Sequence, residues 1–240
     1  MSVYITGDTH GGFQRFGMKY FQEQKKMSRK DTVIITGDFG GLWGGTPSEK
    51  YWLDWLEDKP FTTAFLDGNH ENFDMLNALP ERLWHGGRVH EVRPHVLHLM
   101  RGQIFDIGGY TFFTMGGASS HDIQDGILDP EEPGFEERYW RMRRGRARFR
   151  VKGVSWWPEE LPSDEEYEEA RKNLNAQGWE VDYILTHCAP ADTQADRLTD
   201  FLEDIKNRAR YHYWLFGHLH DNKAVDNKHI LLWEQIVQVI

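Results

Sequence analysis

Short apolar runs recur along the chain, and a polar fragment that contains Asp, Asn or His directly follows each of them. The runs occupy residues 3–5, 33–35, 64–66, 183–185 and 213–216. Apolar runs of this kind, bounded by glycine, are typical of strands that are buried on both faces, as in a parallel sheet. We therefore expect a set of parallel-type strands whose ends open into polar loops.

Several segments between these runs have the apolar spacing of helices. We expect helices over residues 13–26, 48–57, 71–79, 163–176 and 195–208. Ser163 can cap the amino end of the fourth helix, and Glu166 stands where it would complete a capping box. Strands that alternate with helices predict a layered α/β fold.

Shorter strand patterns occur in the middle and at the end of the chain. They occupy residues 96–99, 103–107, 110–114, 229–233 and 236–240. Gly108 and Gly109 predict a hairpin turn between the second and third of these strands. We expect the first three strands to add antiparallel sheet to the first half of the fold, and the last two to form a closing hairpin.

Residues 118–162 interrupt the alternation with a loop-rich insertion. Its acidic stretch, residues 125–137, precedes a basic stretch, residues 138–152. Long irregular segments in compact domains are usually lids, binding loops or disordered segments. We expect one domain over residues 1–240, with residues 118–162 as a lid within it.

Composition and charge narrow the class of protein. The chain has 240 residues, of which 14% are aromatic, and this favours a globular domain over a disordered chain. Its formal net charge of −10 argues against an extended nucleic-acid-binding surface. No apolar run approaches the roughly 20 residues that span a bilayer. The single cysteine, Cys188, and an amino end without signal-peptide features favour the reducing cytoplasm.

The polar fragments after the apolar runs carry side chains that bind metal ions. They are Asp8, His10, Asp38, Asn69, His187, His218 and His220. Any one of them alone would more often be a turn or cap residue. Together they provide two carboxylates, four imidazoles and one amide, which are more ligands than one tetrahedral zinc site takes. Such a set suits two adjacent ions that share a carboxylate. Two such ions clamp a phosphoryl group during in-line displacement and turn a shared water into hydroxide.

The combined motifs resemble those of the calcineurin-like metallophosphoesterase superfamily. The matching fragments are Gly7-Asp8-Thr9-His10, Gly37-Asp38, Gly68-Asn69-His70-Glu71, His187 and Gly217-His218-Leu219-His220. The resemblance covers nearly the whole chain. It implies a four-layer α-β-β-α sandwich with a dinuclear metal site at the strand ends.

The resemblance also implies roles for individual residues. Asp8, His10 and His220 would bind the first ion, and Asp38 would bridge the two ions. The second ion would take three further ligands, namely Asn69, His187 and His218. His70 would face the substrate, where it stabilises the transition state or protonates the leaving oxygen.

One departure from the superfamily is informative. After Asp38 the chain continues Phe39-Gly40-Gly41-Leu42, without the Asp and Arg that follow this motif in the protein-phosphatase branch. That absence argues against a Ser/Thr protein phosphatase. It also leaves open which residue orients His70, because Asp74 is a weak candidate that is better explained as a solvated helix residue.

Arginines and one tryptophan are the candidate substrate-binding residues. They are Trp43, Arg146, Arg148 and Arg150. Arginine binds phosphate through paired N–H groups, and tryptophan stacks on nucleobases. Alternatively, the arginines belong to a solvated loop and neutralise nearby acidic residues, and Trp43 packs in the core. His121 and Asp122 follow a strand and a glycine pair, and they are a further candidate metal pair.

These observations predict a dinuclear-metal phosphoesterase that hydrolyses phosphodiester or nucleotide-like substrates through a metal-bridging hydroxide. The alternatives are a phosphomonoesterase, and a non-catalytic metal- or nucleotide-binding or scaffold protein on the same fold. Mn is the first choice of ion, and Fe, Zn, Ni and Mg also suit the ligands. We expect the partner to be a phosphate-ester small molecule or an oligonucleotide. The oligomeric state is left open.

Overall fold

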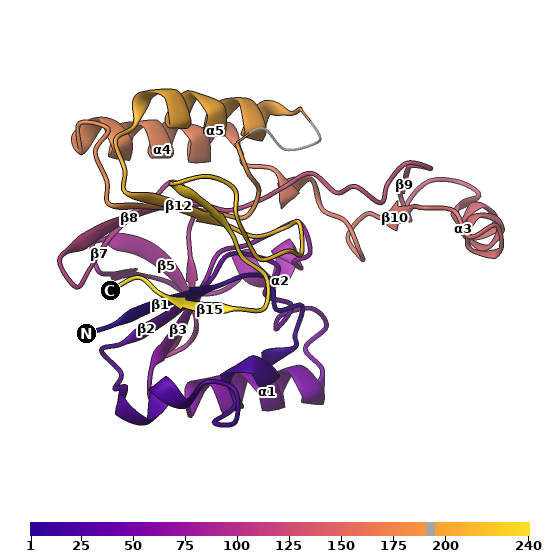
Figure 1. The fold of residues 1–240 in the computed structure, drawn as a ribbon. Helices are drawn as coiled ribbons and strands as arrows, with labels where there is room; N and C mark the ends of the chain where they lie inside the picture. The colour runs from indigo at the N-terminus through magenta and orange to yellow at the C-terminus, as the bar shows by residue number, and fades with distance from the viewer. Residues whose placement is uncertain (191–194) are drawn as a thin grey trace.

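Two β-sheets face each other at the centre of the molecule, and helices cover their outer faces (Figure 1). The structure is a computed structural model that describes residues 1–190 and 195–240. Helix α1 (Pro47–Glu57) lies on one side, and α4 (Asp164–Ala176) and α5 (Arg197–Arg208) lie on the other. The expected four-layer α-β-β-α sandwich is confirmed.

The first sheet has strand order β15-β1-β2-β3-β6-β5-β4. Its strands are β1 (Val3–Thr6), β2 (Thr32–Ile35), β3 (Thr62–Phe65), β4 (Glu81–Trp84), β5 (Gly87–Arg93), β6 (Val96–Leu99) and β15 (Ile236–Gln238). The four strands β1, β2, β3 and β6 run parallel. The remaining three extend the edges of the sheet in antiparallel fashion.

The second sheet has strand order β13-β14-β12-β11-β8-β7. Its strands are β7 (Ile104–Ile107), β8 (Tyr110–Met115), β11 (Tyr183–Thr186), β12 (Tyr213–Phe216), β13 (Lys223–Ala224) and β14 (His229–Leu231). Parallel pairing joins β8, β11, β12 and β14. Strands β7 and β8 form the expected hairpin, with Gly108 and Gly109 at its turn.

Side chains alternate between the two faces of each strand, and this alternation separates three layers of core. On β2, Val33 and Ile35 pack in the cluster that contains α1, whereas Ile34 packs between the sheets. On β11, Leu185 packs between the sheets, and Ile184 packs in the cluster that contains α4 and α5. Strands buried on both faces therefore have the unbroken apolar runs of the sequence.

Helix α4 begins as its sequence predicts. Ser163 accepts a hydrogen bond from the backbone N–H of Glu166, and the Glu166 side chain accepts one from the Ser163 backbone. This is the expected capping box. The expected helix over residues 71–79 is shorter, because α2 spans Phe73–Asn77, capped by Asn72.

The helix expected over residues 13–26 is wrong. Two short 3-10 helices, η1 (Phe13–Phe16) and η2 (Gln22–Lys26), occupy this segment. Gly17 between them is extended, with ψ of 147°. The buried phenylalanines of the segment pack against the first sheet, so that tertiary packing overrides the helical spacing.

The closing hairpin is also wrong. Strand β14 pairs with β12 and β13 in the second sheet, whereas β15 pairs with β1 in the first. The two strands thus belong to different sheets. The antiparallel strands of the first sheet are β4, β5 and β15, whereas the β7–β8 hairpin belongs to the second sheet.

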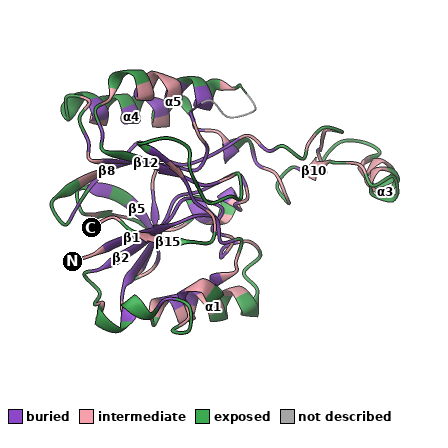
Figure 2. Cartoon of the chain, in the orientation of Figure 1, coloured by how far each residue is buried: buried purple, intermediate pink, exposed green. Residues whose placement is uncertain are grey.

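The insertion projects from the body of the molecule (Figure 1). It contains β9 (Ile127–Leu128), α3 (Phe135–Arg144), β10 (Arg150–Val151) and η3 (Pro158–Glu160). We call residues 122–156 the arm. Ala118 and Trp157, on either side of it, are packed in the core. Helix α3 was not expected, and it buries none of its residues (Figure 2). The role of the insertion as a lid stays a prediction.

Among residues 1–190 and 195–240, no helix has both the length and the apolar composition needed to cross a bilayer.

A chain of buried polar side chains connects β5 and β6 with the loop that follows β3. His90 Nδ1 is 3.0 Å from His98 Nδ1, and His98 Nε2 is 3.0 Å from Asp67 Oδ1. Arg101 donates two hydrogen bonds to the other oxygen of Asp67. In the tautomer of His98 that donates to Asp67, Nδ1 accepts, and His90 is then the donor in the first contact. Burial and the neighbouring His98 lower the pKa of His90 from 6.5 to about 4.

We expect this histidine to make folding stability depend on pH. An unfolded chain binds a proton at His90 below about pH 6.5, whereas the folded chain binds it only near pH 4. Stability therefore falls as pH falls through this window, by about 2 kcal/mol between pH 7 and pH 5. Urea unfolding at both pH values measures the loss. His90→Gln should remove most of it and the exposed control His212→Gln should not; an unchanged loss in His90→Gln would contradict the assignment.

Candidate metal centre

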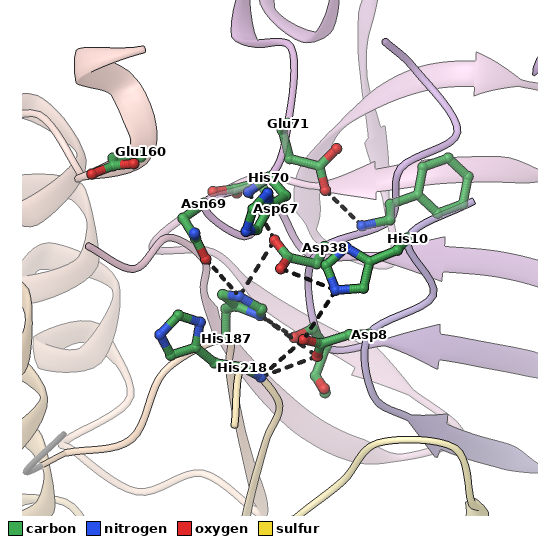
Figure 3. A network of polar contacts seen from close by, with 12 residues as sticks. Asp8, His10, Asp38, Asp67, Asn69, His70, Glu71, Glu160, His187 and His218 are labelled. Carbon is green, nitrogen blue, oxygen red and sulfur yellow. Dashed lines mark hydrogen bonds and ion pairs between the residues drawn. The ribbon is translucent and has the colours of Figure 1, made fainter. Parts of the chain in front are cut away.

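The polar fragments of the sequence meet where strands of both sheets end (Figure 3). Asp8 follows β1, Asp38 follows β2, and Asn69 follows β3 in the first sheet. His187 and His218 follow β11 and β12 in the second sheet. His187 Nδ1 lies 2.8 Å from the Thr36 carbonyl oxygen, to which it can donate, and this contact joins the two sheets at the centre.

Four side chains form a compact group of metal-ligand type. The donor atoms of Asp8, His10, Asp38 and His220 all lie within 4.8 Å of one another. His10 Nε2 and His220 Nε2 are 2.9 Å apart, and His220 Nε2 is 3.1 Å from Asp8 Oδ2. Both carboxylates are buried and both imidazoles are exposed. The group is open to solvent on its histidine side.

A second group lies on the other side of Asp38. His187 Nε2 is 3.4 Å from Asp38 Oδ1 and 3.3 Å from Asn69 Oδ1. The ring of His218 is 4.9 Å from that of His187. Since His10 Nε2 lies 3.5 Å from the other oxygen, Asp38 Oδ2, the Asp38 carboxylate faces both groups.

The backbone is strained at several of these residues. Positive φ angles occur at His10 (44°), Asp38 (46°), His218 (72°) and His220 (48°). Residues other than glycine rarely adopt positive φ angles, and backbone strain of this kind clusters at functional sites. The turns hold these side chains toward the shared space.

The glycines of the motifs leave room for the ligand side chains. A Cβ on Gly68 would lie 2.0 Å from Asp38 Oδ1 and 2.7 Å from His187 Nε2. A Cβ on Gly217 would lie 2.2 Å from Asp8 Oδ1. Only glycine therefore lets these loops pack directly against the carboxylates. This cradle, with its mixed nitrogen and oxygen donors, fits divalent ions.

The electrostatics of the centre favour positive charge. Burial opposes ionisation of Asp38, but His187, His70 and His10 hold its pKa well below the usual range. Burial also disfavours a charged His187, yet Asp38 and Asp8 raise its pKa to about 10. Two buried carboxylates thus attract a cation, a requirement that divalent ions meet.

The family model for calcineurin-like phosphoesterases matches residues 1–222. This chain belongs to the calcineurin-like phosphoesterase family. The resemblance seen in the sequence is confirmed. Family membership and the group of Asp8, His10, Asp38 and His220 together support a metal-dependent phosphoesterase. No curated protein matches the chain at a significant level.

Asn69 is oriented by residues that the sequence motifs do not include. Its Nδ2 donates to Ser120 Oγ at 3.3 Å, and Ser120 Oγ donates to Glu160 at 2.6 Å (Figure 3 shows Asn69 and Glu160). The Asn69 amide oxygen consequently points toward His187. Partners of this kind orient the ligands of metal sites in metalloproteins. No spacing signal in the sequence links Asn69 to residues 51 and 91 positions later.

His70 lies at the edge of the centre and contacts the insertion. Its backbone N–H donates to Asp38 Oδ1 at 2.8 Å. Arg150 Nη2 lies 3.2 Å from His70 Nδ1 and 3.3 Å from Nε2. Burial is the main cause that lowers the pKa of His70. Asp74, the weak candidate for orienting His70, instead accepts a hydrogen bond from Trp157 Nε1 at 2.8 Å.

Arg150 is fixed at this position by an acid of the insertion. Its Nε lies 2.9 Å from Asp122 Oδ1, and its Nη2 lies 2.6 Å from Oδ2. Its Nη1 donates to the Ser155 carbonyl at 2.9 Å. The neighbouring His121 lies beside the second group, with its Nε2 2.7 Å from His218 Nε2. The metal pair of His121 and Asp122 stays a prediction.

The other predicted substrate-binding residues lie in different settings. Trp43 packs edge-on against Trp157, with ring centroids 5.6 Å apart, which is the packing alternative. Arg146 and Arg148 are exposed on the arm. A substrate role for these three residues stays a prediction.

Proposed function

We propose that the protein hydrolyses phosphodiester or nucleotide-like substrates at a centre of two divalent ions. The observation that carries the proposal is the position of Arg150. Its guanidinium is only 11% exposed at the side chain and lies against His70. A phosphate bound at the centre would meet a fixed guanidinium and an imidazole together.

The ligand groups suggest how the ions would be held. Asp8, His10 and His220 suit one ion, and a separate set, Asn69, His187 and His218, suits the other. The two oxygens of Asp38 face both groups and suit a shared ligand. When bound, two such ions activate water as a nucleophile and neutralise charge on the phosphate. Mn(II) is our first choice among the ions these donors accept.

The roles of His70 and Arg150 follow from their contacts. Arg150 can donate to a phosphate oxygen, since guanidinium N–H groups match phosphate geometry. His70 can donate to the leaving oxygen as it gains charge. The backbone bond from His70 to Asp38 ties the position of the imidazole to the centre.

An activity screen tests the proposal. The purified protein with Mn(II) is assayed on p-nitrophenyl phosphate, bis-p-nitrophenyl phosphate, cyclic nucleotides and dinucleoside polyphosphates. Parallel assays with Fe, Zn, Ni and Mg identify the preferred ion. We expect diester hydrolysis to exceed monoester hydrolysis; the opposite order would favour the phosphomonoesterase. A lack of hydrolysis with every ion would support a metal- or nucleotide-binding role. The cytoplasmic location belongs to this proposal and is tested by fractionating cells.

Arg150→Gln should weaken substrate binding. A hydrogen bond to a charged group contributes about 1.5–3 kcal/mol, so we expect KM for bis-p-nitrophenyl phosphate to rise about 10- to 100-fold. If the contact is equally strong in the ground state and the transition state, kcat changes little. Asp122→Asn, which loosens Arg150, should raise KM by less. Arg210→Gln, which removes an exposed arginine paired with Glu180, is the control. An unchanged KM in Arg150→Gln would contradict the proposal that Arg150 binds the substrate.

A further inference from the structure

A run of arginines on the arm lacks acidic partners. Within the described residues, no salt bridge involves Arg141, Arg143, Arg144, Arg146 or Arg148. The basic residues that flank this run are each paired, with the pairs Arg138–Glu132, Arg150–Asp122 and Lys152–Asp129. The unpaired run therefore stands out from the rest of the arm.

This arrangement is unusual for a chain with excess acid. Residues 138–152 contain eight basic and no acidic side chains, although the whole chain has a formal net charge of −10. Helix α3 lies at the far end of the insertion, away from the body of the molecule, and it buries none of its residues (Figures 1 and 2). The positive charge of these arginines is therefore available to a negatively charged binding partner.

Aromatic side chains lie among these arginines. Trp140 is 51% exposed. The guanidinium of Arg143 lies 5.6 Å from the Trp140 ring and 5.9 Å from the Tyr139 ring. Exposed aromatic faces beside arginines are typical of surfaces on which the bases of single-stranded nucleic acids stack.

The run also leads to the metal centre. Arg150 on β10 contacts His70, and Arg148 and Arg146 precede it on the same strand of chain. Four residues of extended chain span at most about 14 Å, so Arg146 lies within that distance of Arg150. Arg146, Arg148 and Arg150 thus recur at every second residue outward from the metal centre. A nucleic-acid strand, which carries one phosphate on each nucleotide, matches such a row of positive charges.

We propose that the arm binds single-stranded nucleic acid. The phosphates contact Arg141, Arg143, Arg144, Arg146 and Arg148, and a base stacks on Trp140. This binding places a phosphodiester of the same strand at Arg150 and His70, a step that rests on the proposed function. This proposal departs, for the arm, from the expectation that the chain lacks an extended nucleic-acid surface.

Binding is measured by fluorescence anisotropy of labelled dT20 and U20 oligonucleotides, between 50 and 200 mM KCl, with the metal-loaded full chain. For single strands the slope of log K against log salt is about −0.7 for each phosphate neutralised. Arg141→Gln/Arg144→Gln and Arg146→Gln/Arg148→Gln should each reduce the slope by about 1.4. Trp140→Ala should weaken binding at least about fivefold. These side chains are exposed or on a helix without buried residues, so the fold should not depend on them.

The control is Lys25→Gln/Lys26→Gln, which removes two exposed basic residues of η2. It should bind as the wild type does. Equal slopes for the wild type and both arginine variants would overturn the proposal. Equally tight binding of poly-glutamate would also overturn it, in favour of an acidic protein partner. Wild-type hydrolysis of bis-p-nitrophenyl phosphate is measured in parallel. Binding of the oligonucleotides without hydrolysis would contradict only the proposed function. Hydrolysis without binding of the oligonucleotides would contradict only the proposal that the arm binds nucleic acid.

Discussion

Asp38→Asn is expected to lower diester hydrolysis by roughly 10³-fold, the scale seen when one strong electrostatic contact at a reacting centre is lost. The reason is that Asp38 faces both ligand groups, with Oδ2 toward His10 and Oδ1 toward His187. Asparagine has one oxygen, no charge and nearly the same size. It can still accept the hydrogen bond from the His70 backbone, so the loop should keep its shape while the shared ligand is lost.

Two measurements check this expectation. The first is kcat/KM on bis-p-nitrophenyl phosphate, and the second is metal content by elemental analysis. We expect the variant to lose bound metal together with activity. Asp204→Asn is a matched control, since Asp204 is a half-exposed carboxylate of α5 paired with Arg208, and such pairs contribute little. Full activity and full metal content in Asp38→Asn would contradict the shared-ligand role.

His70→Asn is expected to lower kcat by about 10²- to 10⁴-fold, the usual contribution of a positioned proton donor. Metal content should not change, because the contact of His70 with the centre is made by its backbone N–H rather than its ring. The loss should grow as the leaving group becomes more basic, because a poor leaving group depends more on the proton it receives.

A series of diesters with different leaving groups tests the assignment. If His70 donates the proton, the ratio of wild-type to variant kcat rises along the series. A constant ratio would show that His70 only stabilises charge. Loss of metal in the variant would instead make His70 a ligand. His85→Asn, at an exposed histidine, is the control for the substitution itself.

The strands and their terminal loops could be predicted because both signals are local. An apolar run such as residues 33–35 is buried on both faces, and Asp38 follows it within three residues. The spatial meeting of the motifs was implied by the family resemblance rather than by spacing. The capping box of α4 was also local, since Ser163 and Glu166 are three residues apart.

Contacts between distant residues could not be predicted. The residues around His70 come from the insertion, where Asp122 and Arg150 meet across 28 positions. Strand β15 pairs with β1, at the other end of the chain, and not with its neighbour β14. Helix α3 was missed because it buries no side chain, and so it lacks the apolar stripe by which helices are recognised.

The two ends of the arm enter the body through packed residues, Ala118 and Trp157. The length of chain between these anchors can change without disturbing the core, since exposed loops tolerate insertion and deletion. The glycine cradle has no such freedom, because any Cβ at Gly68 would collide with the side chain of Asp38. Diversity among relatives should therefore gather in the segment between the anchors. If the arm binds the substrate as proposed, exchanging that segment between two relatives should transfer preference for one substrate over another and leave the proposed hydrolytic chemistry in place.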